Sequence, residues 1–430
     1  MKTVIRKKSY AEVMKMTTKR HKKPLRQVSI LRKLIRLLSR VDLKLTDFSY
    51  DMIGMEKLGE KEPCLFLMNH SSFIDLEIVA YMLSDRPFHI VCTKDAFVGL
   101  GPILRLLGCI PTKKFINDIH LVKDMRYVVK NLKESVLMYP EASYSFDGTA
   151  TPLPDSIGKC VKFLYVPVVM IRTHGAFLRD PLYNGLQRRK VKVSATMQYL
   201  LSSEEIQQKS VEEINHILQE SFSFDNFKEQ QEKHIVVTEK FRADGLHRVL
   251  YRCPHCETEG KMQGKGITIR CKACQKEYEL TETGYLKAVS GEGKFTHIPD
   301  WYRWERECVQ KELEENSYCL DIEVKICMLV NPRCIYEVGE GRLVHSKNGF
   351  HLTGCDGQLD YTQIPQASYS LYSDFNWYQI GDMICIGDEQ VQYYCFPKNG
   401  ENVVAKTRLA AEELFKPESV KLSYFFTGTD

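Results

Sequence analysis

A histidine and an aspartate five positions apart, His70 and Asp75, are the first residues of this sequence whose types and spacing suggest chemistry. They follow the apolar run 63–68 and lead into the helical-looking stretch 76–83. Five positions within one helix would set the two side chains about 140° apart. We therefore expect His70 in the loop before the helix and Asp75 in its first turns. There the carboxylate can hold one tautomer of the ring and leave the other nitrogen free as a general base.

The same residues also allow a purely structural interpretation. Ser72 stands three positions before Asp75, which is the serine-x-x-acid pattern of a helix start. In that interpretation Asp75 only accepts hydrogen bonds from backbone donors. Because a short motif is a hypothesis until its structural context is known, the surrounding elements have to decide between the two interpretations.

Short apolar runs alternate with amphipathic ones between residues 47 and 200. We expect strands at 64–68, 88–92, 136–139, 164–171 and 191–197, and helices at 73–83, 98–107, 119–132 and 156–163. A charged helix over 202–220 closes this region. Such alternation predicts an α/β fold, whose ligand crevice lies beyond the carboxyl ends of the strands. His70 follows one such end and Glu141 follows another.

Three further motifs follow the first one in order. They are Gly101-Pro102-Ile103-Leu104 with Gly108 to Lys114, then Tyr139-Pro140-Glu141-Ala142-Ser143-Tyr144-Ser145, and finally Val166-Pro167-Val168. With the Asn-His-x4-Asp block at 69–75, the chain resembles the glycerolipid acyltransferases of the lysophosphatidic acid acyltransferase type over residues 40–220. The resemblance implies a direct transfer of a fatty acyl group from a thioester to a lipid hydroxyl, with His70 as general base and Asp75 as its orienting acid.

The resemblance also implies the residues that bind substrate. These are Asn69 in the first block, Lys113 and Lys114 in the second, and Glu141 and Ser143 in the third. The family usually has an arginine where this chain has the two lysines, and Gly-Thr-Arg where it has Ala142-Ser143-Tyr144. An arginine for an acceptor phosphate is therefore missing. We expect the acceptor to be a lysophospholipid or a related glycerolipid, and the donor to be acyl-CoA or acyl carrier protein.

Four of the fifteen cysteines form two Cys-x2-Cys pairs, at Cys253 with Cys256 and at Cys271 with Cys274. This spacing predicts a tetrahedral thiolate site for structural zinc, in a zinc ribbon over residues 246–285. The other cysteines are scattered through apolar stretches, and their total number is odd. That pattern favours free thiols in a reducing cytoplasm over a disulfide framework.

Positive charge is concentrated at the start of the chain. Residues 1–44 hold fifteen lysines and arginines against two acidic residues, so this segment is +13 while the whole chain is +5. Residues 29–38 read as a short helix with a leucine and isoleucine side and a basic side, which is the composition of a helix lying on an anionic membrane surface. The alternative is an ordinary surface helix whose apolar side packs on the next domain.

The remaining sequence completes the predicted domain plan. A basic arm (1–45) precedes the α/β domain (46–225); the ribbon is followed by a helical linker (286–316) and a β-rich domain (317–430), which is loosely similar to pleckstrin-homology or GRAM modules. No run of eighteen apolar residues predicts a membrane span, and the first ten residues lack a secretory signal. We expect a cytoplasmic protein bound peripherally to the inner face of a membrane. The rival interpretations are a nucleic-acid-binding zinc-ribbon protein, which the leucine-rich arm disfavours, and a lipid-binding pseudoenzyme.

Overall fold

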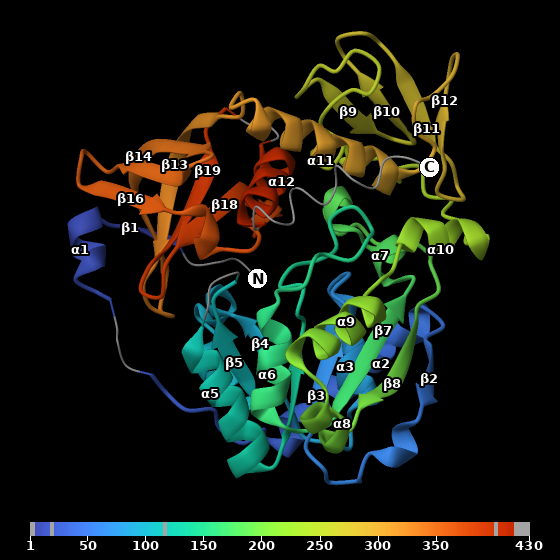
Figure 1. The fold of residues 1–430 in the computed structure, drawn as a ribbon, viewed down its shortest axis with the longest axis vertical. Coiled ribbons are helices and arrows are strands. Elements are labelled where there is room, and N and C mark those ends of the chain that lie inside the picture. The colour runs from blue at the N-terminus through green and yellow to red at the C-terminus, as the bar shows by residue number, and fades with distance from the viewer. Residues whose placement is uncertain (1–4, 18–20, 115–117, 400–402, 417–430) are drawn as a thin grey trace.

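A seven-stranded sheet forms the centre of the first half of the chain (Figure 1). The structure is a computed structural model that describes residues 5–17, 21–114, 118–399 and 403–416. In spatial order the strands are β2 (Ser49–Ile53), β8 (Ser194–Leu201), β7 (Val168–His174), β3 (Leu65–Met68), β6 (Ser135–Met138), β4 (Phe88–Thr93) and β5 (Cys109–Thr112). All neighbours run parallel except β7 and β8. The predicted α/β domain is therefore present, with an antiparallel exception at one side.

The central strand β3 shows why both faces of this sheet are covered. Its four residues are all buried, as expected for a strand with helices on both sides. Because side chains alternate along a strand, Phe66 and Met68 enter one apolar core while Leu65 and Leu67 enter the other. Helices α2 (Ser29–Leu45) and α3 (Ile74–Met82) line the first core, and α5 (Ile119–Tyr127), α6 (Ser156–Leu164), α8 (Ser203–Gln208) and α9 (Val211–Ser221) line the second.

Two expected helices differ in extent from the sequence prediction. Helix α2 continues to Leu45 instead of stopping near residue 38. Leu43 lies more than one turn beyond residue 38 and is still buried, so the packed side of the helix extends past the predicted end. The charged helix expected over 202–220 is two helices, α8 and α9. Ser202 and Ser210 each cap a new helix, accepting from the backbone N–H of Glu205 and Glu213, and this second cap divides the segment.

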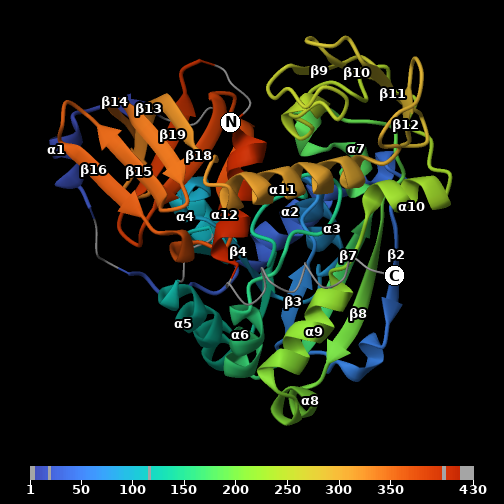
Figure 2. The same ribbon diagram turned by 45° about the horizontal axis from the view of Figure 1, so that its top comes forward.

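A small antiparallel sheet carries the paired cysteines. After α10 (Asn226–Glu232) the strands β9 (Met262–Lys265), β10 (Thr268–Cys271), β11 (Glu277–Leu280) and β12 (Leu286–Ala288) pair in sequence order. Helix α11 (Ile298–Glu314) follows, and it buries Trp301, Glu305 and Val309 at four-residue spacing. Figure 2 shows α11 running from this small sheet toward the C-terminal sheet, above the α/β domain.

The C-terminal domain is a second, antiparallel sheet closed by a helix. Its order is β16-β15-β14-β13-β19-β18-β17, formed by β13 (Leu320–Leu329), β14 (Ile335–Ser346), β15 (Gly349–Gly354), β16 (Leu359–Gln363), β17 (Tyr372–Trp377), β18 (Gly381–Gly387) and β19 (Gln392–Pro397). Helix α12 (Val404–Phe415) buries almost its entire length, because it lies beside α11 and against β17 and β18 (Figure 1). The β-rich region expected after residue 317 is thus present.

The N-terminal arm divides between the two large domains. Strand β1 (Ile5–Lys7) pairs in parallel with residues 335–337 of β14, and α1 (Tyr10–Met14) also contacts that strand. Residues 21–27 instead contact the α/β domain, where His21 meets Asp124 and Arg26 meets Glu134. Only the α2 part of the expected arm therefore presents a long helix at the surface of the α/β domain.

Candidate acyl-transfer site

The His70 side chain is held by Asp75 beyond the carboxyl end of β3. The His70 Nδ1 atom lies 3.0 Å from Asp75 Oδ2. Asp75 is fully enclosed, whereas His70 keeps 20% of its side chain exposed. The Nε2 atom of His70 has no hydrogen-bond partner among the described residues. This is the predicted arrangement, in which the acid orients the ring and the far nitrogen stays available as a base.

Asp75 also accepts two backbone hydrogen bonds, so part of the structural interpretation holds as well. The N–H groups of Ser71 and Ser72 donate to Asp75 Oδ2, at 2.7 and 3.1 Å. A serine cap is nevertheless absent from the described helix start, because Phe73 occupies the N-cap position and Ser72 Oγ has no partner. These backbone bonds fix the carboxylate that in turn fixes His70.

Two tyrosines pack against the His70 ring. The ring of Tyr139 stacks on it with centroids 4.0 Å apart, and that of Tyr144 lies at 4.3 Å. Burial lowers the pKa of His70, and the nearby Lys114 lowers it further, while the hydrogen bond and charge of Asp75 act in the opposite direction. His70 is therefore neutral at physiological pH, as a general base must be.

Glu141 ties the third motif to the first. Its Oε1 accepts the backbone N–H of His70 at 3.1 Å, and its Oε2 accepts that of Thr151 at 2.7 Å. Burial raises the pKa of Glu141 to about 7, although these two hydrogen bonds and the charge of Arg408 lower it. Each oxygen receives one N–H, so the ionised carboxylate suits this bridge best. Glu141 thus supports the backbone that carries the base.

Asn69, the predicted substrate-binding residue of the first motif, makes hydrogen bonds to other protein groups in this structure. Its side chain is fully buried, and its Nδ2 donates to Ser71 Oγ and Thr173 Oγ1 at 3.2 and 3.1 Å. Its Oδ1 accepts the backbone N–H of Thr173 at 2.8 Å. All of its polar atoms are occupied, so Asn69 fastens the catalytic turn to β7.

The two lysines of the second motif lie in different surroundings. Lys113 donates from Nζ to the carbonyl oxygen of Asp388 in the C-terminal domain, at 2.7 Å. Lys114 holds its Nζ 4.3 Å from the centre of the Tyr372 ring and, among the described residues, forms no hydrogen bond or ion pair. Burial lowers the pKa of both ammonium groups, that of Lys113 to about 8. The charges of Asp95 and Asp374 act against this effect of burial at Lys114.

Ser143 contacts an arginine from the other end of the chain, which the sequence analysis missed. Arg408 of α12 places Nη2 3.3 Å from Ser143 Oγ and 3.4 Å from Thr151 Oγ1. Its guanidinium also lies 4.8 Å from the ring of Phe146. Ser143 is therefore occupied by a protein contact. The one available signal was a charged residue between the apolar runs 403–405 and 409–411.

The four paired cysteines come together as predicted. Their sulfur atoms all lie within 4.8 Å of one another, and the pairs Cys253–Cys274 and Cys256–Cys271 are each 3.7 Å apart. Zn–S bonds of about 2.3 Å in a tetrahedron place sulfurs about 3.8 Å apart. The cluster therefore fits a tetrahedral metal ion. The cysteines outside this cluster are scattered over the described domains, for example Cys64 in the α/β domain and Cys395 in the C-terminal sheet, and both of these carry free thiols.

Helix α2 exposes a continuous apolar stripe. Six side chains are between 49% and 78% exposed and fall on one face at helical spacing: Ile30, Leu34, Leu37, Leu38, Val41 and Leu45. Lys33, Arg40 and Lys44 adjoin the stripe along one side. The prediction that this side packs on the next domain is thus wrong, because the stripe faces outward. None of the helices in the described part of the chain is long and apolar enough to cross a bilayer.

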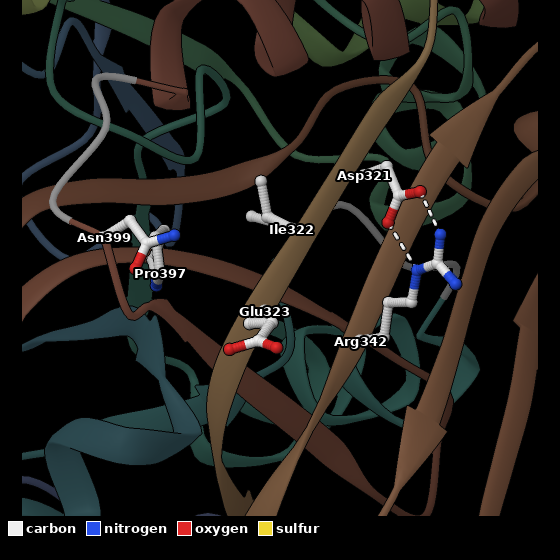
Figure 3. A pocket seen from close by; sticks show the side chains of 6 residues that line it. All are labelled: Asp321, Ile322, Glu323, Arg342, Pro397 and Asn399. Carbon is white, nitrogen blue, oxygen red and sulfur yellow. Dashed lines mark hydrogen bonds and ion pairs between the residues drawn. The ribbon is translucent and has the colours of Figure 1, made fainter.

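A surface pocket of about 410 Å³ lies elsewhere, on the C-terminal domain. Figure 3 shows its lining, in which Asp321 and Arg342 face each other across β13 and β14 as an ion pair. Its other lining residues are Ile322, Glu323, Pro397 and Asn399. No residue of the four motifs lines this pocket, so it is separate from the surroundings of His70.

Comparison with known proteins concerns mainly the part of the chain that carries His70. No curated protein matches the chain. A similar solved structure is the 1-acyl-sn-glycerophosphate (LPA) acyltransferase PlsC from Thermotoga maritima, with 15% identity, a TM-score of 0.37, and coverage of 44% of this chain and 76% of that one. The acyltransferase family model matches residues 49–173, which include His70, Asp75, Lys114 and Glu141. The part of the chain that positions His70 is therefore a domain of the acyltransferase family.

Proposed function

We propose that this protein transfers a fatty acyl group from a thioester donor to a hydroxyl of a lysophospholipid or related glycerolipid at a membrane surface. The observation that carries the proposal is the pair formed by His70 and the enclosed Asp75, with a neutral ring whose Nε2 is free. Acyl-CoA and acyl carrier protein are the two candidate donors. Both present the acyl group as a thioester, and both carry a phosphate that a lysine can meet.

The reaction needs a proton acceptor and then a proton donor, and His70 supplies both. His70 Nε2 takes the proton of the acceptor hydroxyl while the oxygen attacks the thioester carbonyl carbon. The Asp75 carboxylate stabilises the imidazolium that results. The carbon–sulfur bond then breaks, the new ester forms, and the imidazolium returns its proton to the departing thiolate. No covalent acyl-enzyme is required.

The apolar stripe of α2 supports action at a lipid surface. Exposed leucine and isoleucine side chains beside Lys33, Arg40 and Lys44 match a bilayer interface with anionic headgroups. The C-terminal half of α2 is also anchored near the site, because Arg179 Nη2 donates to both carboxylate oxygens of Asp42, each at 2.8 Å. Phe73, 55% exposed, begins the turn after His70. A lysolipid could thus reach the base from the membrane.

Zinc is the metal that we propose for the four-cysteine cluster. Cys253, Cys256, Cys271 and Cys274 would hold it, and four thiolates leave no position for substrate. The ion would therefore stabilise the small sheet and take no part in acyl transfer. The free thiols elsewhere in the chain support a reducing compartment and hence the cytoplasmic leaflet.

The C-terminal domain remains a proposed lipid-binding module of the pleckstrin-homology or GRAM kind. Its run of antiparallel strands closed by α12 supports that proposal, since such modules also end in a helix.

Within the catalytic site, Lys114 is the residue we propose for an anionic headgroup or for the donor's phosphate. The stripe on α2 favours a lipid partner over a nucleic acid, because nucleic acids are bound through phosphate contacts and aromatic stacking.

The direct test is lipid mass spectrometry. The purified full-length protein is incubated with mixed lysolipids in vesicles and with acyl-CoA or acyl carrier protein, and new diacyl products are sought. We expect one acceptor class to gain a chain, and His70→Ala to lower the rate at least 100-fold. The matched control is His297→Ala, because His297 forms a similar pair with Asp225 at 2.7 Å outside the motifs. A wild-type protein that binds vesicles but yields no product would establish the pseudoenzyme instead.

A further inference from the structure

The loop that carries Glu141 is held from two directions. On one side Glu141 itself bridges the backbone of His70 and Thr151. On the other side Arg408 reaches Ser143 and Thr151 from α12, in a different domain and more than 250 positions later. Arg408 is 3% exposed, so its charge acts in a nearly water-free environment.

Arg408 is itself fixed by a buried network. Its Nε donates to Glu412 Oε1 at 3.0 Å, one turn along α12. Glu412 also receives Arg306 of α11 at 2.6 Å and the hydroxyl of Ser370 at 2.7 Å. The two arginines therefore share one carboxylate, but only Arg408 extends past it to the motif loop.

We propose that Arg408 is a positioning residue of the acyltransferase site, which holds the Glu141 loop in its working conformation through Ser143 and Thr151. This inference rests on the proposed function and extends it to a second domain. A guanidinium is absent from Ala142-Ser143-Tyr144, where related enzymes have Gly-Thr-Arg, and α12 brings one to the same loop. The C-terminal domain thus belongs to the catalytic unit.

The pKa of Glu141 depends on the groups that surround it, and Arg408 is one of them. His70 meets it from the turn before α3, Thr151 from its own loop, and Arg408 and Tyr369 from the C-terminal domain. Of these, Arg408 carries the fixed positive charge, and it lowers the pKa of Glu141 against the effect of burial. Removing the charge raises that pKa, so Glu141 takes up its proton at a higher pH and the bridge from His70 to Thr151 weakens.

The test compares Arg408→Gln, Arg408→Lys and Arg306→Gln in the full-length protein. We expect Arg408→Gln to move the acid limb of kcat/KM up by about 1 pH unit, with a rate near pH 7 about fivefold lower that recovers in alkali. Arg408→Lys restores most of this shift. Arg306→Gln disturbs the same carboxylate and lowers the melting temperature, but leaves the acid limb in place.

Two outcomes overturn the inference. In the first, Arg408→Gln and Arg306→Gln lower activity and melting temperature alike, and neither moves the acid limb, so Arg408 serves only stability. The second outcome is measured by hydrogen exchange at backbone amides. This measurement needs no enzymatic turnover, so it tests Arg408 even if the wild-type protein transfers no acyl group and the proposed function fails. We expect the amides of His70 and Thr151 to exchange faster in Arg408→Gln and not in Arg306→Gln. Equal exchange in the two variants refutes the role.

Discussion

The stripe on α2 gives a quantitative prediction for membrane binding. In the double variant Leu37→Asn with Leu38→Asn, two neighbouring apolar side chains, 59% and 64% exposed, are lost from the stripe. Together they offer slightly more than the surface of one leucine to the bilayer. Burying one leucine is worth about 2 kcal/mol, which corresponds to roughly a 30-fold change in an equilibrium constant. We expect the partition coefficient for vesicles to fall by this factor.

Sedimentation with vesicles of phosphatidylcholine and phosphatidylserine measures this partition. The control is Val289→Asn with Ile364→Asn, because each of those side chains is 60% exposed outside α2. The control pair should bind vesicles as wild type does, and the α2 variant should keep its activity on a short-chain acceptor below its micelle concentration. Equal vesicle binding by the α2 variant and wild type, or an equal loss in the control, would refute the membrane role of α2.

Three further predictions concern the site and the cysteine cluster. For wild type, kcat/KM should rise with pH through about 7, because the buried Glu141 must lose its proton to accept both N–H groups. The variant Glu141→Gln should be slow at every pH, because a side-chain amide has only one acceptor oxygen. Lys114→Met should lower kcat/KM about tenfold for anionic acceptors and leave monoacylglycerol unchanged, which competition assays measure. Removing metal with a chelator, or introducing Cys256→Ser, should lower the melting temperature measured by calorimetry, with one zinc per chain lost in elemental analysis.

Much of the α/β domain is predictable from sequence because its pattern is local. Buried strands such as β3 read as short apolar runs, and the helices between them show their own periodicity. The division of a charged helical segment into two helices is harder to predict. The helical pattern of residues 202–220 continues through Ser210, although Ser210 caps a second helix there. The local sequence pattern also does not predict that β7 and β8 pair in the antiparallel sense, because strand direction depends on the path of the chain between the two strands.

The candidate site shows a similar division. His70 and Asp75 are close in sequence, so their spacing predicts the contact that the structure contains. The hydrogen bonds between Asn69 and Thr173 could not be predicted, because the two residues lie about a hundred positions apart in the sequence. Arg408 is still more remote, and a charged residue within a helix does not indicate which loop it will meet. Tertiary partners of this kind follow from how the domains pack.

The pairing of β1 with β14 has a consequence for the order in which the chain is built. Residues 5–7 are synthesised more than 300 residues before their partners at 335–337. During synthesis this short strand must wait, while the α/β domain can already fold beneath it. This pairing thus joins two segments more than 300 positions apart in the sequence, and a variant that lacks residues 1–28 would leave this part of β14 without its β1 partner.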